Sequence, residues 1–155
     1  MGRATMSDKT KDVILLVEDN PDDRDLTIRA LRKNRVVNEI VVARDGSEAL
    51  VWLFDEKRAA AGHASLPTMI LLDLKLPKVN GLEVLAAIRE NDRTRNLPVV
   101  VLTSSDEERD MGESQRLGAT YIRKSVDFTE FREVIRRVIK EWPVQVDEVD
   151  GSVKK

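Results

Sequence analysis

Acidic, hydroxyl and basic side chains stand at the ends of short apolar runs in this sequence. Glu18 and Asp19 follow the run at 13–17, Asp73 follows 69–72, Thr103 follows 99–102, and Lys124 follows 120–123. Clustered carboxylates repel one another, by about 4 kcal/mol for two charges 4 Å apart at an effective dielectric constant of about 20. They therefore need a compensating cation, and oxygen ligands without His or Cys suit Mg²⁺. With a lysine and a hydroxyl opposite the metal, the set favours phosphoryl transfer onto a central aspartate.

The spacing of apolar residues predicts alternating strands and helices that would bring these side chains together. Continuous apolar runs predict strands at 13–17, 39–43, 69–72, 99–102 and 120–123. Helical spacing and capping residues predict helices from Pro21 to about Asn34, Asp45 to about Ala60, about Gly81 to at least Arg89, Ser105 to about Leu117, and Asp127 to Pro143. This alternation predicts an α/β fold, the flavodoxin-like doubly wound (βα)5 type, with a five-stranded parallel sheet in the order 2-1-3-4-5. Ligands of such folds bind outside the carboxyl ends of the strands.

Composition limits the class of protein. The chain has 155 residues, 41% of them hydrophobic, which suffices for one domain with a buried core. It has no Cys and one His, His63, so disulfide frameworks and thiolate or His-rich metal sites are excluded. We interpret His63 as a solvated loop residue. A net charge of −2 predicts no nucleic-acid partner, and short apolar runs predict no membrane span and a cytoplasmic protein.

The same residues resemble a known family, the response-regulator receiver domains of two-component signalling. The matching positions, in chain order, are Glu18-Asp19, Asp73 to Pro77, Gly81, Thr103-Ser104, Tyr121 and Lys124. The resemblance covers about 12–142, which we expect to be the receiver domain. We expect residues 1–11 to be a disordered N-terminal segment and residues 143–155 a C-terminal tail, with no output domain. Three features, 18–23, 59–67 and Lys124-Ser125, look most like stand-alone regulators associated with bacterial phytochromes.

The resemblance implies a role for each matching residue. Asp73 would accept a phosphoryl group from the phosphohistidine of a sensor histidine kinase. Glu18, Asp19, Asp73 and the backbone carbonyl of Lys75 would bind Mg²⁺ or Mn²⁺. Lys124, Thr103 and Tyr121 would bind the phosphoryl group or switch with it, and Lys75 and Ser105 would tune its hydrolysis. The family usually has a proline, often after a cis bond, where this chain has Ser125, so a cis bond after Lys124 is in doubt.

The resemblance implies a signalling switch that catalyses only its own phosphorylation and dephosphorylation. Its partners would be a sensor histidine kinase, in the finer assignment a bacterial phytochrome, and a downstream phosphotransfer or effector protein. The phytochrome-type resemblance also suggests a homodimer. Two alternatives remain open. A metal-dependent phosphatase of the haloacid dehalogenase type would need a second acid at position 75, where this chain has Lys75. A flavodoxin-like FMN binder would need a phosphate loop rich in Gly, Ser and Thr at 18–23, where this chain is acidic.

Overall fold

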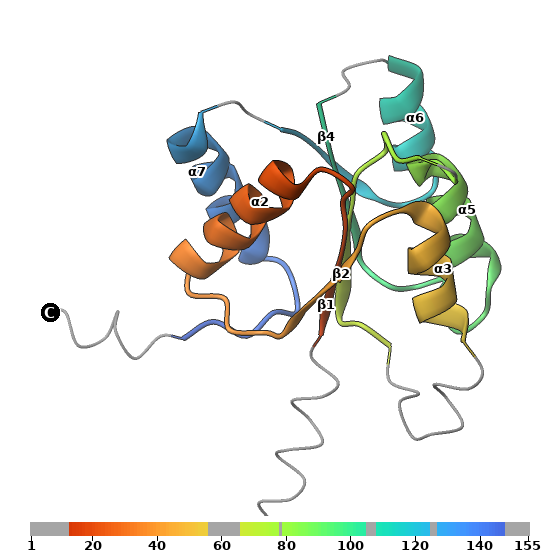
Figure 1. Ribbon diagram of the computed structural model, residues 1–155, viewed down its shortest axis with the longest axis horizontal. Helices are drawn as coiled ribbons and strands as arrows, with labels where there is room; N and C mark the ends of the chain where they lie inside the picture. The colour runs from red at the N-terminus through yellow and green to blue at the C-terminus, as the bar shows by residue number, and fades with distance from the viewer. Residues whose placement is uncertain (1–12, 56–65, 78, 105–107, 125–126, 148–155) are drawn as a thin grey trace, which may run out of the picture.

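Five parallel strands form the centre of the protein, in a computed structural model that describes residues 13–55, 66–77, 79–104, 108–124 and 127–147 (Figure 1). The strands are β1 (Ile14–Val17), β2 (Ile40–Ala43), β3 (Met69–Leu72), β4 (Val99–Thr103) and β5 (Thr120–Arg123). They pair in the order β2-β1-β3-β4-β5, with every neighbouring pair parallel. The predicted doubly wound fold and its strand order are therefore confirmed. Parallel neighbours need crossover connections, which here contain helices.

Helices cover both faces of the sheet (Figure 1). They are α2 (Pro21–Lys33), α3 (Gly46–Phe54), α5 (Gly81–Glu90), α6 (Glu108–Arg116) and α7 (Phe128–Ile139). Helices α2 and α7 lie on one face and α3, α5 and α6 on the other. Strand side chains alternate between the faces, so Ile14 and Leu16 join the core under α2 and α7, whereas Leu15 and Val17 join the core under α3 and α5. Burial on both sides explains the uninterrupted apolar runs.

Side-chain caps fix where the helices next to the strand ends begin. The Asn20 side chain accepts a hydrogen bond from the Asp23 amide at 3.0 Å, and Pro21 occupies the first turn of α2. At α5, Asn80 and Glu83 form a reciprocal capping box, with both bonds at 3.0 Å. These caps place the first turns of α2 and α5 at the edge of the sheet where β1 and β3 end.

The structure corrects the predicted ends of two helices. Helix α3 ends at Phe54, because Asp55 has extended backbone angles, so the expected continuation to about Ala60 is wrong. Helix α7 ends at Ile139, four residues before the proline that was expected to end it. The following residues are not all a loose tail: Val146 forms an antiparallel bridge with Val36, and the Val37 amide donates to the Gln145 carbonyl at 2.9 Å.

Several predictions fall on residues outside the described ranges. They concern the N-terminal segment 1–11, His63 in the loop at 59–67, the helix start at Ser105, the peptide bond before Ser125, and the tail beyond 147. Within the described ranges, none of the helices combines the length and apolar character needed to span a bilayer.

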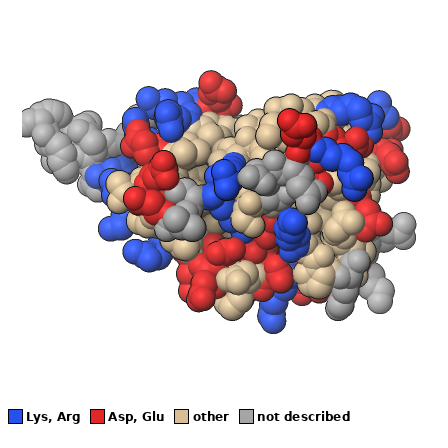
Figure 2. Space-filling view, turned by 90° about the horizontal axis from the view of Figure 1, so that it is seen from above, with Lys and Arg blue, Asp and Glu red and all other residues tan. Residues whose placement is uncertain are grey.

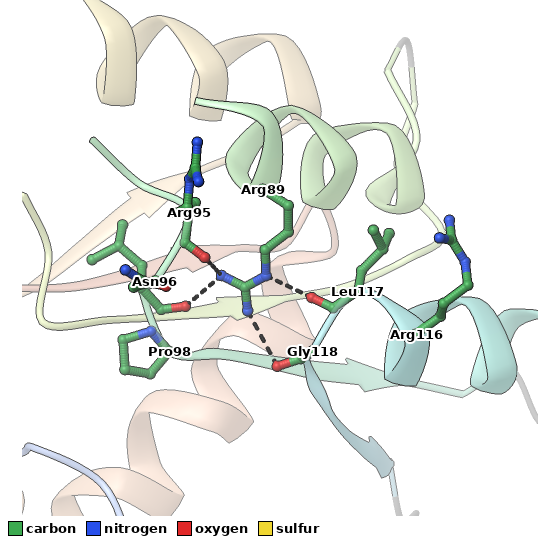
Figure 3. Close-up of a pocket in the computed structure, with 8 residues that line it drawn as sticks. Arg89, Arg95, Asn96, Pro98, Arg116, Leu117 and Gly118 are labelled. Carbon is green, nitrogen blue, oxygen red and sulfur yellow. Dashed lines mark hydrogen bonds between the residues drawn. The ribbon is translucent and has the colours of Figure 1, made fainter. Parts of the chain in front are cut away.

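An arginine ties the helices together at the amino ends of the strands, opposite the edge where β1 and β3 end. The guanidinium of Arg89, at the end of α5, donates to four backbone carbonyls at 2.5 to 3.2 Å (Figure 3). These carbonyls belong to Arg95, Leu97, Leu117 and Gly118. Gly118 has a φ of +77°, as expected of a glycine that ends a helix. Arg89 thus joins α5, the connection to β4 and the end of α6.

Candidate functional site

Five of the predicted site residues lie together at the carboxyl ends of β1, β3, β4 and β5: Glu18, Asp19, Asp73, Thr103 and Lys124. Backbone hydrogen bonds set their register. The Asp73 amide donates to the Val17 carbonyl at 3.0 Å, which places Asp73 beside Glu18. The Lys124 amide donates to the Thr103 carbonyl at 2.8 Å. Figure 2 views this end of the molecule and shows acidic side chains gathered in its lower middle, with basic side chains beside them.

Three carboxylates form the acidic part of the site. Glu18, Asp19 and Asp73 each offer an oxygen, and these oxygens all lie within 4.8 Å of one another. Glu18 and Asp73 are buried, at 2% and 6% exposure, whereas Asp19 is exposed. The sequence prediction that these three acids converge is correct. Two buried acids and one exposed acid make a site that is closed on the protein side and open to solvent on the other.

The ammonium group of Lys124 lies among three carboxylates. Its Nζ donates to Glu18 Oε1 at 2.7 Å, to Asp23 Oδ2 at 2.9 Å and to Asp73 Oδ2 at 3.3 Å. The lysine side chain is 14% exposed. A lysine ammonium has three N–H donors, so all three are engaged by these acceptors. The predicted placement of Lys124 against the acidic cluster is therefore observed in the structure.

Burial and charge perturb two groups of the site. Burial raises the pKa of Glu18 most, Lys124 lowers it and the negative charge of Asp73 adds to the rise, so that the net pKa is about 7. Burial lowers the pKa of Lys124, but the hydrogen bonds that it donates to Glu18 and Asp23 outweigh this effect, and the net pKa lies above its usual value. Lys124 therefore stays positively charged. Its single charge cannot balance two buried carboxylates, so the negative charge of one of them is not neutralised unless a further cation binds.

The remaining predicted residues surround this cluster. The Lys75 amide donates to Asp73 Oδ1 at 3.2 Å, which orients the carboxylate, while the Lys75 side chain is exposed. Thr103 is fully buried at the end of β4. Tyr121 is half-buried on β5 next to Val101 and packs against the core under α3 and α5. Ser105, expected to tune hydrolysis, lies outside the described residues.

Asp23 is the residue that the sequence analysis did not assign to the site. It lies in the first turn of α2 and forms an ion pair with Lys124, 101 residues away. Its position after Asn20 and Pro21 made it look like a helix-start acid, which is favourable near the positive end of the helix dipole. The available signal was its spacing, because it places Asp23 in the first turn of the helix that follows β1, next to the strand ends.

The donor chemistry fits a hard divalent cation. Carboxylate oxygens alone make up the described cluster, and Mg²⁺ and similar ions prefer such ligands together with water. The exposed Asp19 leaves room for water on the solvent side. Burial and the neighbouring charge of Asp73 raise the pKa of Glu18, and a bound cation would favour its charged form.

Comparison with known proteins identifies the class. The family model described as the response regulator receiver domain matches residues 14–136, so the chain belongs to the response-regulator receiver family. Members of this family are signalling switches. The response regulator Rcp1 from a Synechocystis species is 36% identical over 140 residues, which cover 88% of this chain and 94% of Rcp1.

Solved structures of phytochrome-associated regulators share the fold. The phosphorylated cyanobacterial phytochrome response regulator RcpA is 39% identical, with a TM-score of 0.75 over 84% of this chain and 93% of RcpA. The Mn²⁺-bound form of Rcp1 is 34% identical, with a TM-score of 0.74 over 88% and 99% of the two chains. The bacteriophytochrome response regulator AtBRR is 45% identical, with a TM-score of 0.68 over 88% and 98%.

Proposed function

We propose that this chain is a phosphorylation switch in which Asp73 accepts a phosphoryl group from the phosphohistidine of a sensor histidine kinase. The observation that carries the proposal is the position of Asp73, a buried carboxylate within 3.3 Å of Lys124 and within a three-acid cluster. In the transfer, an Asp73 oxygen forms the new bond to phosphorus while the bond from phosphorus to the histidine nitrogen breaks. Glu18 and Asp19 make the side of Asp73 from which the phosphohistidine approaches polar. The Lys75 amide donates to Oδ1 of Asp73 and holds this oxygen in place.

We propose that Glu18, Asp19, Asp73 and the backbone carbonyl of Lys75 hold Mg²⁺ or Mn²⁺. The Mn²⁺-bound form of the related Rcp1 supports a divalent ion in this family. When bound, such a cation supplies positive charge that offsets the carboxylates and the oxygens of the phosphoryl group. Without a cation, burial raises the pKa of Glu18 to about 7, so a bound cation would stabilise its charged form.

The remaining residues would convert phosphorylation into a change of surface. Lys124 donates to the phosphoryl oxygens, and Thr103 hydrogen-bonds them from the end of β4. Tyr121 changes rotamer with Thr103; it lies on the neighbouring strand, paired with Val101, two residues before Thr103. Lys75 and Ser105 tune how fast water removes the phosphoryl group. The surface of α6, β5 and α7 carries the signal to an effector or phosphotransfer protein.

We extend the proposal to a wider assignment, which the relatives support. Residues 12–142 form the receiver domain, and the kinase partner is a bacterial phytochrome, since the relatives RcpA and AtBRR are regulators of that type. The protein acts in the cytoplasm, forms a homodimer, and catalyses only its own phosphorylation and dephosphorylation.

Intact-mass measurement after incubation with acetyl phosphate tests the proposal. We expect one added phosphoryl group on the wild-type protein that requires Mg²⁺ and is absent from Asp73→Asn. The matched control Asp22→Asn removes an exposed acid of α2 and should retain the adduct. Beryllofluoride, which mimics the phosphoryl group, should raise the melting temperature of the wild-type protein and not that of Asp73→Asn. An adduct on Asp73→Asn, or failure of both reagents on the wild type, would contradict the proposal.

A further inference from the structure

Lys124 has no spare donor in the structure. Its three N–H groups face Glu18, Asp23 and Asp73 at 2.7, 2.9 and 3.3 Å. A phosphoryl oxygen on Asp73 that is to bond this ammonium must either take the place of one of these acceptors or share a donor with it.

The three acceptors differ in how easily they can give up the lysine. Glu18 is 2% exposed, so releasing it would leave a buried carboxylate without a cation. Asp73 is the residue that carries the phosphoryl group. Asp23 is 38% exposed in its side chain and can turn to water instead. It also lies outside the three-acid cluster that fits a metal, and its carboxylate bonds Lys124.

We propose that Asp23 is a positioning residue that holds Lys124 in the unphosphorylated protein and competes with the phosphoryl oxygens for its ammonium group. The inference rests on the function proposed for Asp73. If the phosphoryl oxygen displaces Asp23, the Asp23 ion pair is lost. If the phosphoryl oxygen takes over the bond of Asp73 instead, Asp23 stays bonded to Lys124. The same ammonium then holds the Asp23 carboxylate and the doubly charged phosphoryl group, which repel each other. Both routes make Asp23 oppose phosphoryl binding.

The start of α2 keeps Asp23 in this position. The Asn20 side chain caps the Asp23 amide at 3.0 Å, and the Asn20 amide in turn donates to Glu18 Oε2 at 3.2 Å. The next residue, Arg24, donates to the carbonyls of Glu18 and Asp19 at 3.2 and 3.3 Å. The Asp23 backbone is therefore fixed relative to the site, and only its side chain is free to move between the lysine and water.

Beryllofluoride titration at saturating Mg²⁺ tests the inference. Asp23→Asn keeps the shape of the side chain and removes its charge, so we expect roughly five- to twenty-fold tighter binding than in the wild type. Asp22→Asn is the matched control, because it removes the same charge from the same helix turn at an exposed position, and it should change the affinity less than about twofold. Asp23→Glu restores the carboxylate and should return the affinity toward the wild-type value.

The Mg²⁺ affinity, measured without beryllofluoride, separates this role from a general change of the site. In Asp23→Asn it should stay equal or weaken, because the variant removes negative charge without touching the proposed ligands. Unchanged or weaker beryllofluoride binding in Asp23→Asn, or an equal gain in Asp22→Asn, would overturn the inference. Absence of beryllofluoride binding in the wild-type protein would instead refute the function on which it rests.

Discussion

Oε1 of Glu18 lies 2.7 Å from Nζ of Lys124, although 106 residues separate them in the sequence. The pair joins the ends of β1 and β5, which are separated in the sheet by β3 and β4. Glu18 is almost fully buried, so the ion pair places charge next to the core. A buried ion pair stabilises the fold only when the attraction between its charges and their further hydrogen bonds outweigh the cost of removing both charges from water. In this protein the balance is less favourable, because Asp73 adds a second buried carboxylate to the same ammonium.

We expect the stability of the metal-free protein to fall as the pH rises through neutrality. Folding raises the pKa of Glu18 from 4.5 to about 7, chiefly through burial. A carboxyl with a raised pKa contributes stability that is fully present below pH 4.5 and is lost as the pH rises through about 7. In chelator, this group should therefore reduce the free energy of unfolding by up to about 1.4 kcal/mol per pH unit between these values.

Thermal melts of the wild type and of Glu18→Gln in chelator measure this contribution. The glutamine variant lacks the titrating group, so the difference in melting temperature between the two proteins should change across this pH range. Parallel pH profiles would show that Glu18 does not titrate there.

Asp73→Asn should stabilise the metal-free protein by roughly 1 kcal/mol or more, since it removes a buried charge that repels Glu18. Asparagine keeps an oxygen that can accept from the Lys75 amide, so the local hydrogen bond at 3.2 Å is retained. Urea unfolding in chelator measures the gain. Asp22→Asn removes an exposed acid and should change the stability little. No gain in Asp73→Asn would count against repulsion within the cluster.

The strands and most of the site could be predicted from the sequence because both follow from order along the chain. Strands buried on both faces leave uninterrupted apolar runs, and in a parallel sheet the first polar residues after those runs meet at one edge. Asp73 and Lys124 were found in this way, and the observed strands begin or end within one residue of the predicted runs.

Other features depend on contacts that the local sequence does not encode. The charged residues at 55–58 and the alanines at 59–60 are compatible with a helix, so the end of α3 at Phe54 had no local signal. The pairing of Val146 with Val36 joins segments far apart in the chain. The ion pair between Asp23 and Lys124 depends on the reach of a side chain from the first turn of a helix to the end of β5.

Arg89→Lys should destabilise the protein by about 2 kcal/mol or more, because a lysine cannot donate to four carbonyls in the fork geometry of a guanidinium (Figure 3). The loss should loosen α6 in particular, since two of the four carbonyls lie at its end. Chemical denaturation measures the change. Arg93→Lys at an exposed position is the control and should be nearly neutral. Equal stabilities of the two variants would show that the four bonds contribute little.

Gly81→Ala should destabilise the protein and slow phosphorylation at the same time. A Cβ at Gly81 would lie 2.5 Å from the Leu74 Cα and closer still to the Asp73 carbonyl oxygen, so the backbone after Asp73 must shift. Such overpacking costs about 1–3 kcal/mol, and the shift would displace the proposed phosphoryl acceptor.

Gly112→Ala is the matched control: nothing lies within 4 Å of its added Cβ, and alanine should stabilise α6 by about 0.5–1 kcal/mol. Urea unfolding and the rate of adduct formation with acetyl phosphate measure the two effects. If Gly81→Ala matched Gly112→Ala in both, close packing behind Asp73 would have no part in holding the site.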